Sequence, residues 1–308
     1  MDRNDLYNSF NEVDDDILER SETASKEKKK LVWLKWAAAV ACLCLVVGIS
    51  MHMRDRTLLT ERKNGREISV SDAGVSIPPL DVYLGNDIEA NMIGFFIYHG
   101  SCYVHYEWLE NAENIVGEYL GTAIGLIDEW TPKDGYVELA GSVKGDFYSV
   151  NGYDPSFMLC IVHESGDIST YVCNTGITIK YGSELYEDRI HLTGNYHKIQ
   201  FETRSSWYES KGEVHSLEDG MVVSSFIDAL NAAEFIPWGS VPTIEGHTTS
   251  SIYDTEIYHV YFSMDNGTMV HLRLYENGYV RFQGMLDICV QLPSEDYAEF
   301  IELLDTSM

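Results

Sequence analysis

The feature that most constrains this chain is an uncharged stretch of 18 residues, 36–53, rich in Ala, Val and Leu. As a helix it would be about 27 Å long, close to the ~30 Å hydrocarbon thickness of a bilayer. The preceding residues 31–34 extend the apolar stretch, and Lys35 can reach toward the lipid headgroups. The sequence therefore predicts one transmembrane helix over residues 31–53, in contact with membrane lipid.

A cleaved signal peptide and a lipoprotein are the alternatives for this stretch. A polar region of 30 residues precedes the apolar run, which is long for a signal peptide, and no small-x-small cleavage site follows in residues 51–56. A lipoprotein would use Cys42, but the apolar run continues past it to Val47. The prediction is a retained helix, which makes the chain a single-pass protein of the cell membrane.

The orientation of this helix rests on a cluster of lysines. Five basic residues lie near each end of the helix, so their number decides nothing. The cluster Lys28–Lys30 is dense and close to the apolar run, and a long C-terminal portion is exported largely regardless of its charge. We therefore expect the N-terminus to be cytoplasmic.

The predicted helix divides the chain into segments of different composition. The segment before it is acidic, and the segment after it contains Gly and Pro residues typical of a flexible linker. The predicted organisation is a cytoplasmic tail (1–30), the transmembrane helix (31–53), a linker (54–80), a first extracytoplasmic lobe (81–212) and a second extracytoplasmic lobe (213–308).

The charge is concentrated in the long C-terminal portion. The chain has a formal net charge of −28, and residues 81–308 contribute −27, from 9 basic and 36 acidic side chains. Such a negative field repels phosphate backbones and argues against nucleic-acid binding. The charge can simply keep an exposed domain soluble, or it can attract a cationic ligand such as a basic peptide or a divalent ion.

The acidic tail contains one amphipathic pattern. Leu6, Phe10, Val13 and Ile17 recur at intervals of four, three and four residues, which places them on one stripe of a helix. A single short helix of this kind is marginal alone in water. We predict that these four residues bind a partner with a basic surface; the alternative is a solvated tail whose apolar residues touch the membrane or nothing.

The portion after residue 80 reads as α+β, with antiparallel sheets and packed helices. Residues 95–98 and 102–108 flank His99 and Gly100, which is typical of a hairpin. Apolar residues at helical spacing predict a helix over about 218–233, and Ser294 can cap a final helix.

A second hairpin predicts a disulfide. If Gly166 and Asp167 form the loop between the strands 157–163 and 168–173, Cys160 lies directly opposite Cys173. A cross-strand disulfide could then form outside the cell. Two buried free thiols, or a register slipped by one residue, are the alternatives.

The clearest structural prediction is a three-stranded meander. Asn266–Gly267 and Asn277–Gly278 are typical of two-residue turns. In this register His259 faces Leu274 and lies on the opposite side of the sheet from His271, so the two histidines cannot share a metal. The predicted pairs are Phe262 with His271, Val260 with Arg273, and Arg273 with Phe282.

No sequence motif identifies a reaction. The chain contains no H-E-x-x-H, G-x-S-x-G or G-x-x-x-x-G-K-[ST], and its ten His residues are scattered. No catalytic residue, metal site or cofactor is predicted, and the chain is not expected to be an enzyme.

Several segments resemble a known group of proteins. The acidic tail 5–18, the lysine cluster and the anchor 33–47 resemble single-pass membrane proteins of Gram-positive bacteria described as anti-sigma-factor-like, and stretches 117–130 and 145–153 resemble their outer domains. The resemblance implies that the cytoplasmic part holds a sigma factor while the outer part senses the envelope. The zinc-binding His and Cys of many anti-sigma domains are absent from residues 1–30.

The sequence thus leads to two functional hypotheses. The first is a single-pass membrane regulator, anti-sigma-like, that couples an extracytoplasmic sensing domain to a cytoplasmic transcription partner, a sigma factor. The alternative is a membrane-tethered extracytoplasmic binding module with an inert tail.

Overall fold

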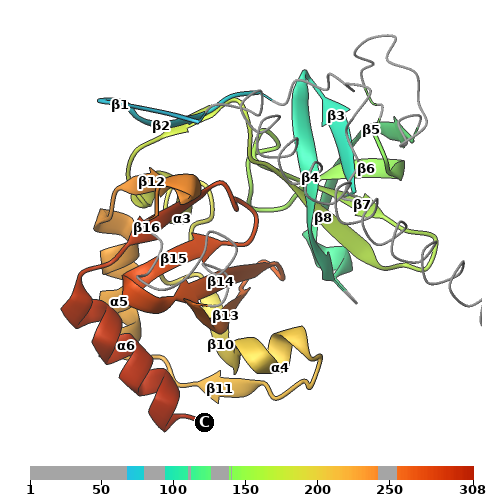
Figure 1. Cartoon of the computed structure of the whole chain (residues 1–308). Helices are drawn as coiled ribbons and strands as arrows, with labels where there is room; N and C mark the ends of the chain where they lie inside the picture. The colour runs from blue at the N-terminus through green and yellow to red at the C-terminus, as the bar shows by residue number, and fades with distance from the viewer. Residues whose placement is uncertain (1–67, 80–93, 110–111, 126–138, 140, 242–254) are drawn as a thin grey trace, which may run out of the picture. The chain divides into compact units, whose positions relative to one another are not determined.

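Antiparallel β-structure dominates the computed structural model of this chain (Figure 1). The structure describes residues 68–79, 94–109, 112–125, 139, 141–241 and 255–308. All of them belong to a unit that extends from Arg66 to Met308. Within these ranges the strands form sheets of three, six and seven strands, and every strand pair is antiparallel.

The seven-stranded sheet contains the predicted meander. On β13 (Glu256–Met264), alternate residues such as Val260 and Phe262 are apolar and join the main core, and the residues between them face the other side. In spatial order its strands are β11 (His215–Leu217), β10 (Tyr196–Thr203), β13 (Glu256–Met264), β14 (Met269–Tyr275), β15 (Tyr279–Phe282), β16 (Ile288–Gln291) and β12 (Phe235–Pro237).

The two other sheets come mainly from the first half of the described region. The predicted hairpin at His99 and Gly100 is confirmed, since both residues have positive φ and Tyr98 pairs with Ser101. The six-stranded sheet consists of β3 (Phe95–Tyr98), β4 (Ser101–Leu109), β8 (Ile168–Cys173), β7 (Met158–Val162), β6 (Lys144–Val150) and β5 (Val116–Ile124), and the three-stranded sheet of β1 (Ser69–Ser71), β2 (Gly74–Ile77) and β9 (Ile177–Ile179).

Two longer helices, α5 (Met221–Ala232) and α6 (Ser294–Thr306), lie side by side next to the seven-stranded sheet (Figure 1). Phe226 stacks on Phe300 with ring centroids 3.8 Å apart, and both rings are part of the main core. Both helices were predicted near these positions. The shorter helices are α3 (Ser183–Tyr186), α4 (Arg204–Tyr208) and the 3-10 turns η2 (Glu113–Ile115), η3 (Trp238–Ser240) and η5 (Glu276–Gly278).

The hairpin between β13 and β14 contacts residues of the six-stranded sheet. The Tyr106 hydroxyl on β4 donates to the Met269 carbonyl (3.0 Å) and accepts from the His271 N–H (2.9 Å). Near the tip of the hairpin, the Tyr153 and Thr268 hydroxyls are 2.8 Å apart. The two bonds of Tyr106 hold β4 beside the first residues of β14.

The structure corrects the expected fold class and the expected location. The predicted fold began with a transmembrane helix, and the chain was expected to be a single-pass protein of the cell membrane. In the ranges that the structure describes, no helix is long and apolar enough to cross a bilayer. The longest of these helices, α6, has 13 residues, about 20 Å, and its exposed face is acidic. The predicted segment 31–53 lies outside the described residues.

The predicted register of the meander is wrong by one residue. The loop between β13 and β14 has three residues, 265–267, because the Met264 N–H donates to the Thr268 carbonyl (2.8 Å) and Ser263 pairs with Met269. The pairs found in the structure are Phe262 with Val270, Val260 with Leu272, His259 with Arg273, and Leu272 with Phe282.

The cross-strand disulfide is also absent. Cys160 pairs with Thr170, whereas Cys173 pairs with Tyr103 on β4, and both thiols are free and buried. The reason is a different loop: the His163 N–H donates to the Asp167 carbonyl (2.9 Å), so three residues, 164–166, connect the two strands instead of the predicted two, and the register shifts by three residues. The two cysteines also belong to different core clusters, on opposite faces of the six-stranded sheet.

Candidate functional site

The strongest concentration of buried charge lies on the face of the seven-stranded sheet that points away from α5 and α6. On β14 the apolar residues Leu272 and Leu274 enter the main core, and the alternating residues His271 and Arg273 face the other side. These polar side chains form what we call the charge network: Glu107, Glu202, Glu256, His259, Tyr261, His271 and Arg273. All of them are buried or half-buried.

A buried ion pair forms one end of the charge network. The Arg273 guanidinium donates from Nε to Glu256 Oε1 (2.5 Å) and from Nη2 to Glu256 Oε2 (2.7 Å), a bidentate arrangement. The Tyr208 hydroxyl lies 3.0 Å from Nη2 and 3.3 Å from Oε2. A β-bulge between Glu256 and Tyr258 brings Glu256 onto the same face as His259.

Two histidines continue the charge network toward β4. His259 Nδ1 and His271 Nε2 are 2.8 Å apart, and His271 Nδ1 lies 3.2 Å from Glu107 Oε1. At the other end, His259 Nε2 is 2.9 Å from Glu256 Oε1. Glu107, His271, His259 and Glu256 therefore form a continuous row from one sheet into the other.

The helix α4 covers this row. The Trp207 ring stacks on the His259 ring, with centroids 4.4 Å apart and planes 14° from parallel. Thr203 caps the helix by accepting from the Ser206 N–H, and the Ser206 hydroxyl donates to Glu202 (2.7 Å). The Tyr261 hydroxyl donates to the other oxygen of Glu202 (2.8 Å).

Burial and partners set the protonation of the charge network. Burial by itself would raise the pKa of the Glu256 carboxyl, but the contacts with His259 and Arg273 outweigh it and lower the pKa to about 2. Burial lowers the pKa of His259, and the attraction of Glu256 only partly offsets this. At neutral pH, Glu256 is therefore charged and His259 is neutral.

Sequence reasoning placed these histidines on opposite faces of the sheet and missed the charge network. A shift of one residue in the pairing register moves every side chain of a strand to the other face. One signal in the sequence favoured the correct register. It pairs apolar with apolar residues, Phe262 with Val270, whereas the predicted register paired Phe262 with His271.

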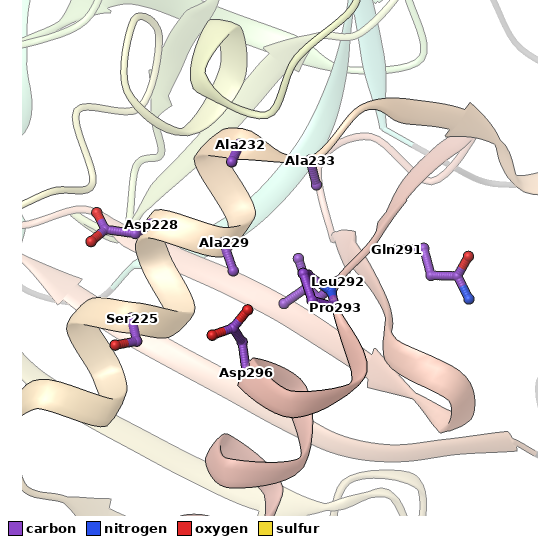
Figure 2. A pocket seen from close by; sticks show the side chains of 9 residues that line it. All are labelled: Ser225, Asp228, Ala229, Ala232, Ala233, Gln291, Leu292, Pro293 and Asp296. Atoms are coloured by element: carbon purple, nitrogen blue, oxygen red, sulfur yellow. The ribbon is translucent and has the colours of Figure 1, made fainter.

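A second candidate site is an open groove of about 560 Å³ between α5 and α6. Figure 2 shows the Asp296 side chain extending from the first turn of α6 toward α5, and the Asp228 carboxylate turned away from α6 at the rim. The groove contains small and apolar side chains and no basic residue. Its lining residues are Ser225, Asp228, Ala229, Ala232, Ala233, Gln291, Leu292, Pro293 and Asp296.

The basic residues of this half of the chain do not neutralise the groove. Between residues 213 and 308 the sequence contains only two, Arg273 and Arg281. Both are buried, with 6% and 3% of their surface exposed. Arg273 is bound to Glu256, and Arg281 packs against Trp238 and donates to the Leu286 carbonyl. The α5–α6 groove is therefore a negatively charged surface.

The predicted partner-binding residues are not part of either candidate site. Leu6, Phe10, Val13 and Ile17 are outside the described residues, so their role stays a prediction. In the part of the chain that the structure describes, no group of His, Cys, Asp and Glu residues is arranged to hold a metal ion.

Comparison with protein-family models, curated proteins and solved structures gives no match for this chain. Any functional conclusion therefore rests on the geometry of the two candidate sites.

Proposed function

We propose that the described region is a binding module for a cationic ligand, not an enzyme, and that the ligand occupies the groove between α5 and α6. The observation that carries this proposal is an open acidic groove in a part of the chain whose only basic side chains are buried. A ligand with amino or guanidinium groups, such as a lysine-rich or arginine-rich peptide segment, fits this chemistry. Its charges would pair with Asp228 and Asp296, and its aliphatic stems would cover the alanines.

The charge network is less suited to direct binding. Its Arg273 is already paired with Glu256, and His259 lies under the Trp207 ring. A ligand would have to displace α4 before it reached any of these groups. The α5–α6 groove needs no such rearrangement.

The test is a calorimetric titration of the full chain with a short oligolysine peptide at physiological ionic strength. The double variant Asp228→Asn/Asp296→Asn should bind roughly tenfold more weakly, because two partly exposed charge pairs contribute about 0.5–1 kcal/mol each. The matched control is a second double variant, Glu118→Gln/Glu113→Gln, which removes the same charge from exposed positions around β5.

The outcomes separate local binding from the general field of the protein. If both double variants lose affinity equally, the peptide responds only to net charge and the groove is not its site. If wild-type protein does not bind the peptide, the proposal is wrong.

A second candidate function rests on the apolar stripe of the N-terminal segment. Leu6, Phe10, Val13 and Ile17 share one face of the predicted helix, and such a face fits an apolar groove on a partner protein. A sigma factor as that partner remains a prediction. A pull-down with residues 1–30, with Phe10→Asp as the disrupted version, tests this function independently of the groove.

A further inference from the structure

The described region contains three Asn-Gly pairs whose side chains have different surroundings. They are Asn151–Gly152, Asn266–Gly267 and Asn277–Gly278, and a fourth pair, Asn64–Gly65, lies outside the described residues. Asparagine is chemically labile, and a following glycine, which has no Cβ, leaves its main-chain nitrogen open to the asparagine side chain. Whether this nitrogen can reach the side-chain amide carbon depends on what holds the side chain in place.

Two of the three asparagines are held in a closed ring of hydrogen bonds. Asn114 Nδ2 donates to the Asn266 carbonyl (3.1 Å), Asn266 Nδ2 to the Asn151 carbonyl (3.1 Å), and Asn151 Nδ2 to the Asn114 carbonyl (2.9 Å). Asn151 Nδ2 also donates to the Val116 carbonyl (3.1 Å). Asn266 Oδ1 accepts from the N–H and the hydroxyl of Thr268 (3.0 and 2.7 Å). The side chain of Asn266 thus makes three hydrogen bonds and that of Asn151 makes two.

Asn277 is held only through its main chain. Its carbonyl accepts from Gln291 Nε2 (3.0 Å), whereas its exposed side chain makes no hydrogen bond to any residue that the structure describes. The φ angle of Asn277 is 62°, a conformation that asparagine tolerates better than most residues. The side chain can therefore turn toward the Gly278 nitrogen while the turn η5 keeps its place.

We propose that Asn277 is the deamidation site of the folded region and that the asparagine ring protects Asn151 and Asn266. The Gly278 nitrogen loses its proton to solvent and bonds to Asn277 Cγ, and the Cγ–Nδ2 bond breaks so that ammonia leaves. Water then opens the resulting cyclic imide. Cleavage of the new bond gives aspartate, and cleavage of the original peptide bond gives isoaspartate. The inference does not depend on the α5–α6 groove.

The two products differ in their effect on the turn. Both replace a neutral amide with a carboxylate, but isoaspartate also adds a carbon atom to the main chain before Gly278. Gly278 is buried, its carbonyl accepts from the Leu292 N–H (2.9 Å), and a Cβ on it would lie 2.9 Å from the Leu292 carbonyl oxygen. A longer main chain does not fit this packing, so the isoaspartate form should unfold at a lower urea concentration than the unmodified protein.

The protection by the ring can be expressed as a ratio of rates. Releasing a side chain from one hydrogen bond of ordinary net strength lowers the reactive population roughly fivefold. Asn266 should therefore deamidate roughly a hundredfold more slowly than Asn277, and Asn151 roughly thirtyfold more slowly. Ageing of the full chain at mildly alkaline pH, followed by proteolytic digestion and mass spectrometry of the peptides, measures each rate separately.

Two variants test the physical cause. Thr268→Val removes one bond to Asn266 Oδ1 and should accelerate deamidation of Asn266 roughly fivefold without changing that of Asn277. Asn277→Gly keeps the positive φ and removes the amide. The aged Asn277→Gly protein should therefore keep its urea midpoint, whereas the midpoint of the aged wild type falls.

Denatured wild-type protein is the control for the local sequence. In guanidinium chloride the ring is absent, so the three Asn-Gly pairs should deamidate at similar rates. Deamidation of Asn277 no faster than that of Asn266 in the folded protein would overturn the proposal. Rate differences that persist unchanged in the denaturant would also overturn it, because they would assign the effect to flanking residues. Both measurements use wild-type protein, so they decide the question even if a variant does not fold.

Discussion

The ion pair between Glu256 and Arg273 offers a quantitative test of the buried charge network. Glu256 is 3% exposed, and the pKa of its carboxyl is about 2, against an ordinary value of 4.5. This difference corresponds to about 3 kcal/mol of stability at neutral pH. Because the pKa is lowered by folding, the contribution is present above about pH 4.5 and is lost as the pH falls toward about 2.

The perturbation is Glu256→Gln, which preserves the shape of the side chain and removes its charge. Arg273 would then be a buried cation without a counterion, so we expect a loss of about 3–5 kcal/mol in the free energy of unfolding at pH 7. Urea unfolding followed by circular dichroism measures it. The difference between wild type and variant should shrink below about pH 4.5, where the wild-type carboxylate begins to lose its contribution.

Two further variants guard this reasoning. Glu256→Gln/Arg273→Met removes both charges and should recover part of the lost stability. Glu209→Gln breaks an exposed pair with Lys211 (3.0 Å) and should leave the urea midpoint unchanged. A Glu256→Gln variant within about 1 kcal/mol of wild type at pH 7 would refute the argument that this pair stabilises the fold.

Three other predictions concern the core, one turn and one thiol. Phe226→Ala removes the ring that stacks on Phe300 and should lower the free energy of unfolding, measured with urea, by about 3–5 kcal/mol. A loss near 1 kcal/mol would contradict this, because it would mean that the site collapses around the cavity. Gly267→Ala should destabilise the protein more than Gly166→Ala. Both glycines have φ above +90°, so backbone strain of about 1–2 kcal/mol is common to both, but a Cβ at Gly267 would lie 2.8 Å from Asn114, whereas a Cβ at Gly166 would have no atom within 4 Å. Equal thermal midpoints of the two variants would contradict this prediction. Burial raises the pKa of the Cys160 thiol to about 12, so Ellman's reagent should modify Cys160 in native protein at pH 8 no faster than the fold opens. Rapid modification of Cys160, located by mass spectrometry, would show that the thiol is accessible and would contradict this prediction.

Local patterns in the sequence predicted much of the secondary structure of the described region. The hairpin around His99 and Gly100 was predicted from the strand-forming segments on either side of them, and both residues have positive φ in the structure. The helices α5 and α6 were predicted from apolar residues at helical spacing, and those residues, among them Phe226 and Phe300, are buried as expected. These features depend on neighbours a few positions away, so the sequence is sufficient.

Loop lengths and their consequences could not be predicted in this way. An Asn-Gly pair indicates a turn but does not say whether two or three residues form it. Contacts of the loop with Asn114 and Asn151, far away in the sequence, surround the three-residue form seen in the structure. The same uncertainty placed Cys160 opposite Cys173, when the loop between their strands is in fact longer.

The sequence by itself determined which residues of a strand or a helix share a face, because side-chain direction follows from the local backbone period, about 2 residues in a strand and about 3.6 in a helix. Only the tertiary structure decided that His259 and His271 share a face and that Glu107 reaches them from another sheet. The physical reason is that strand register depends on the length of a loop. One additional residue in the loop between β13 and β14 moves the side chains of one strand to the opposite face relative to the other strand. In this way His259 and His271 come together, although the register predicted from the sequence placed them on opposite faces.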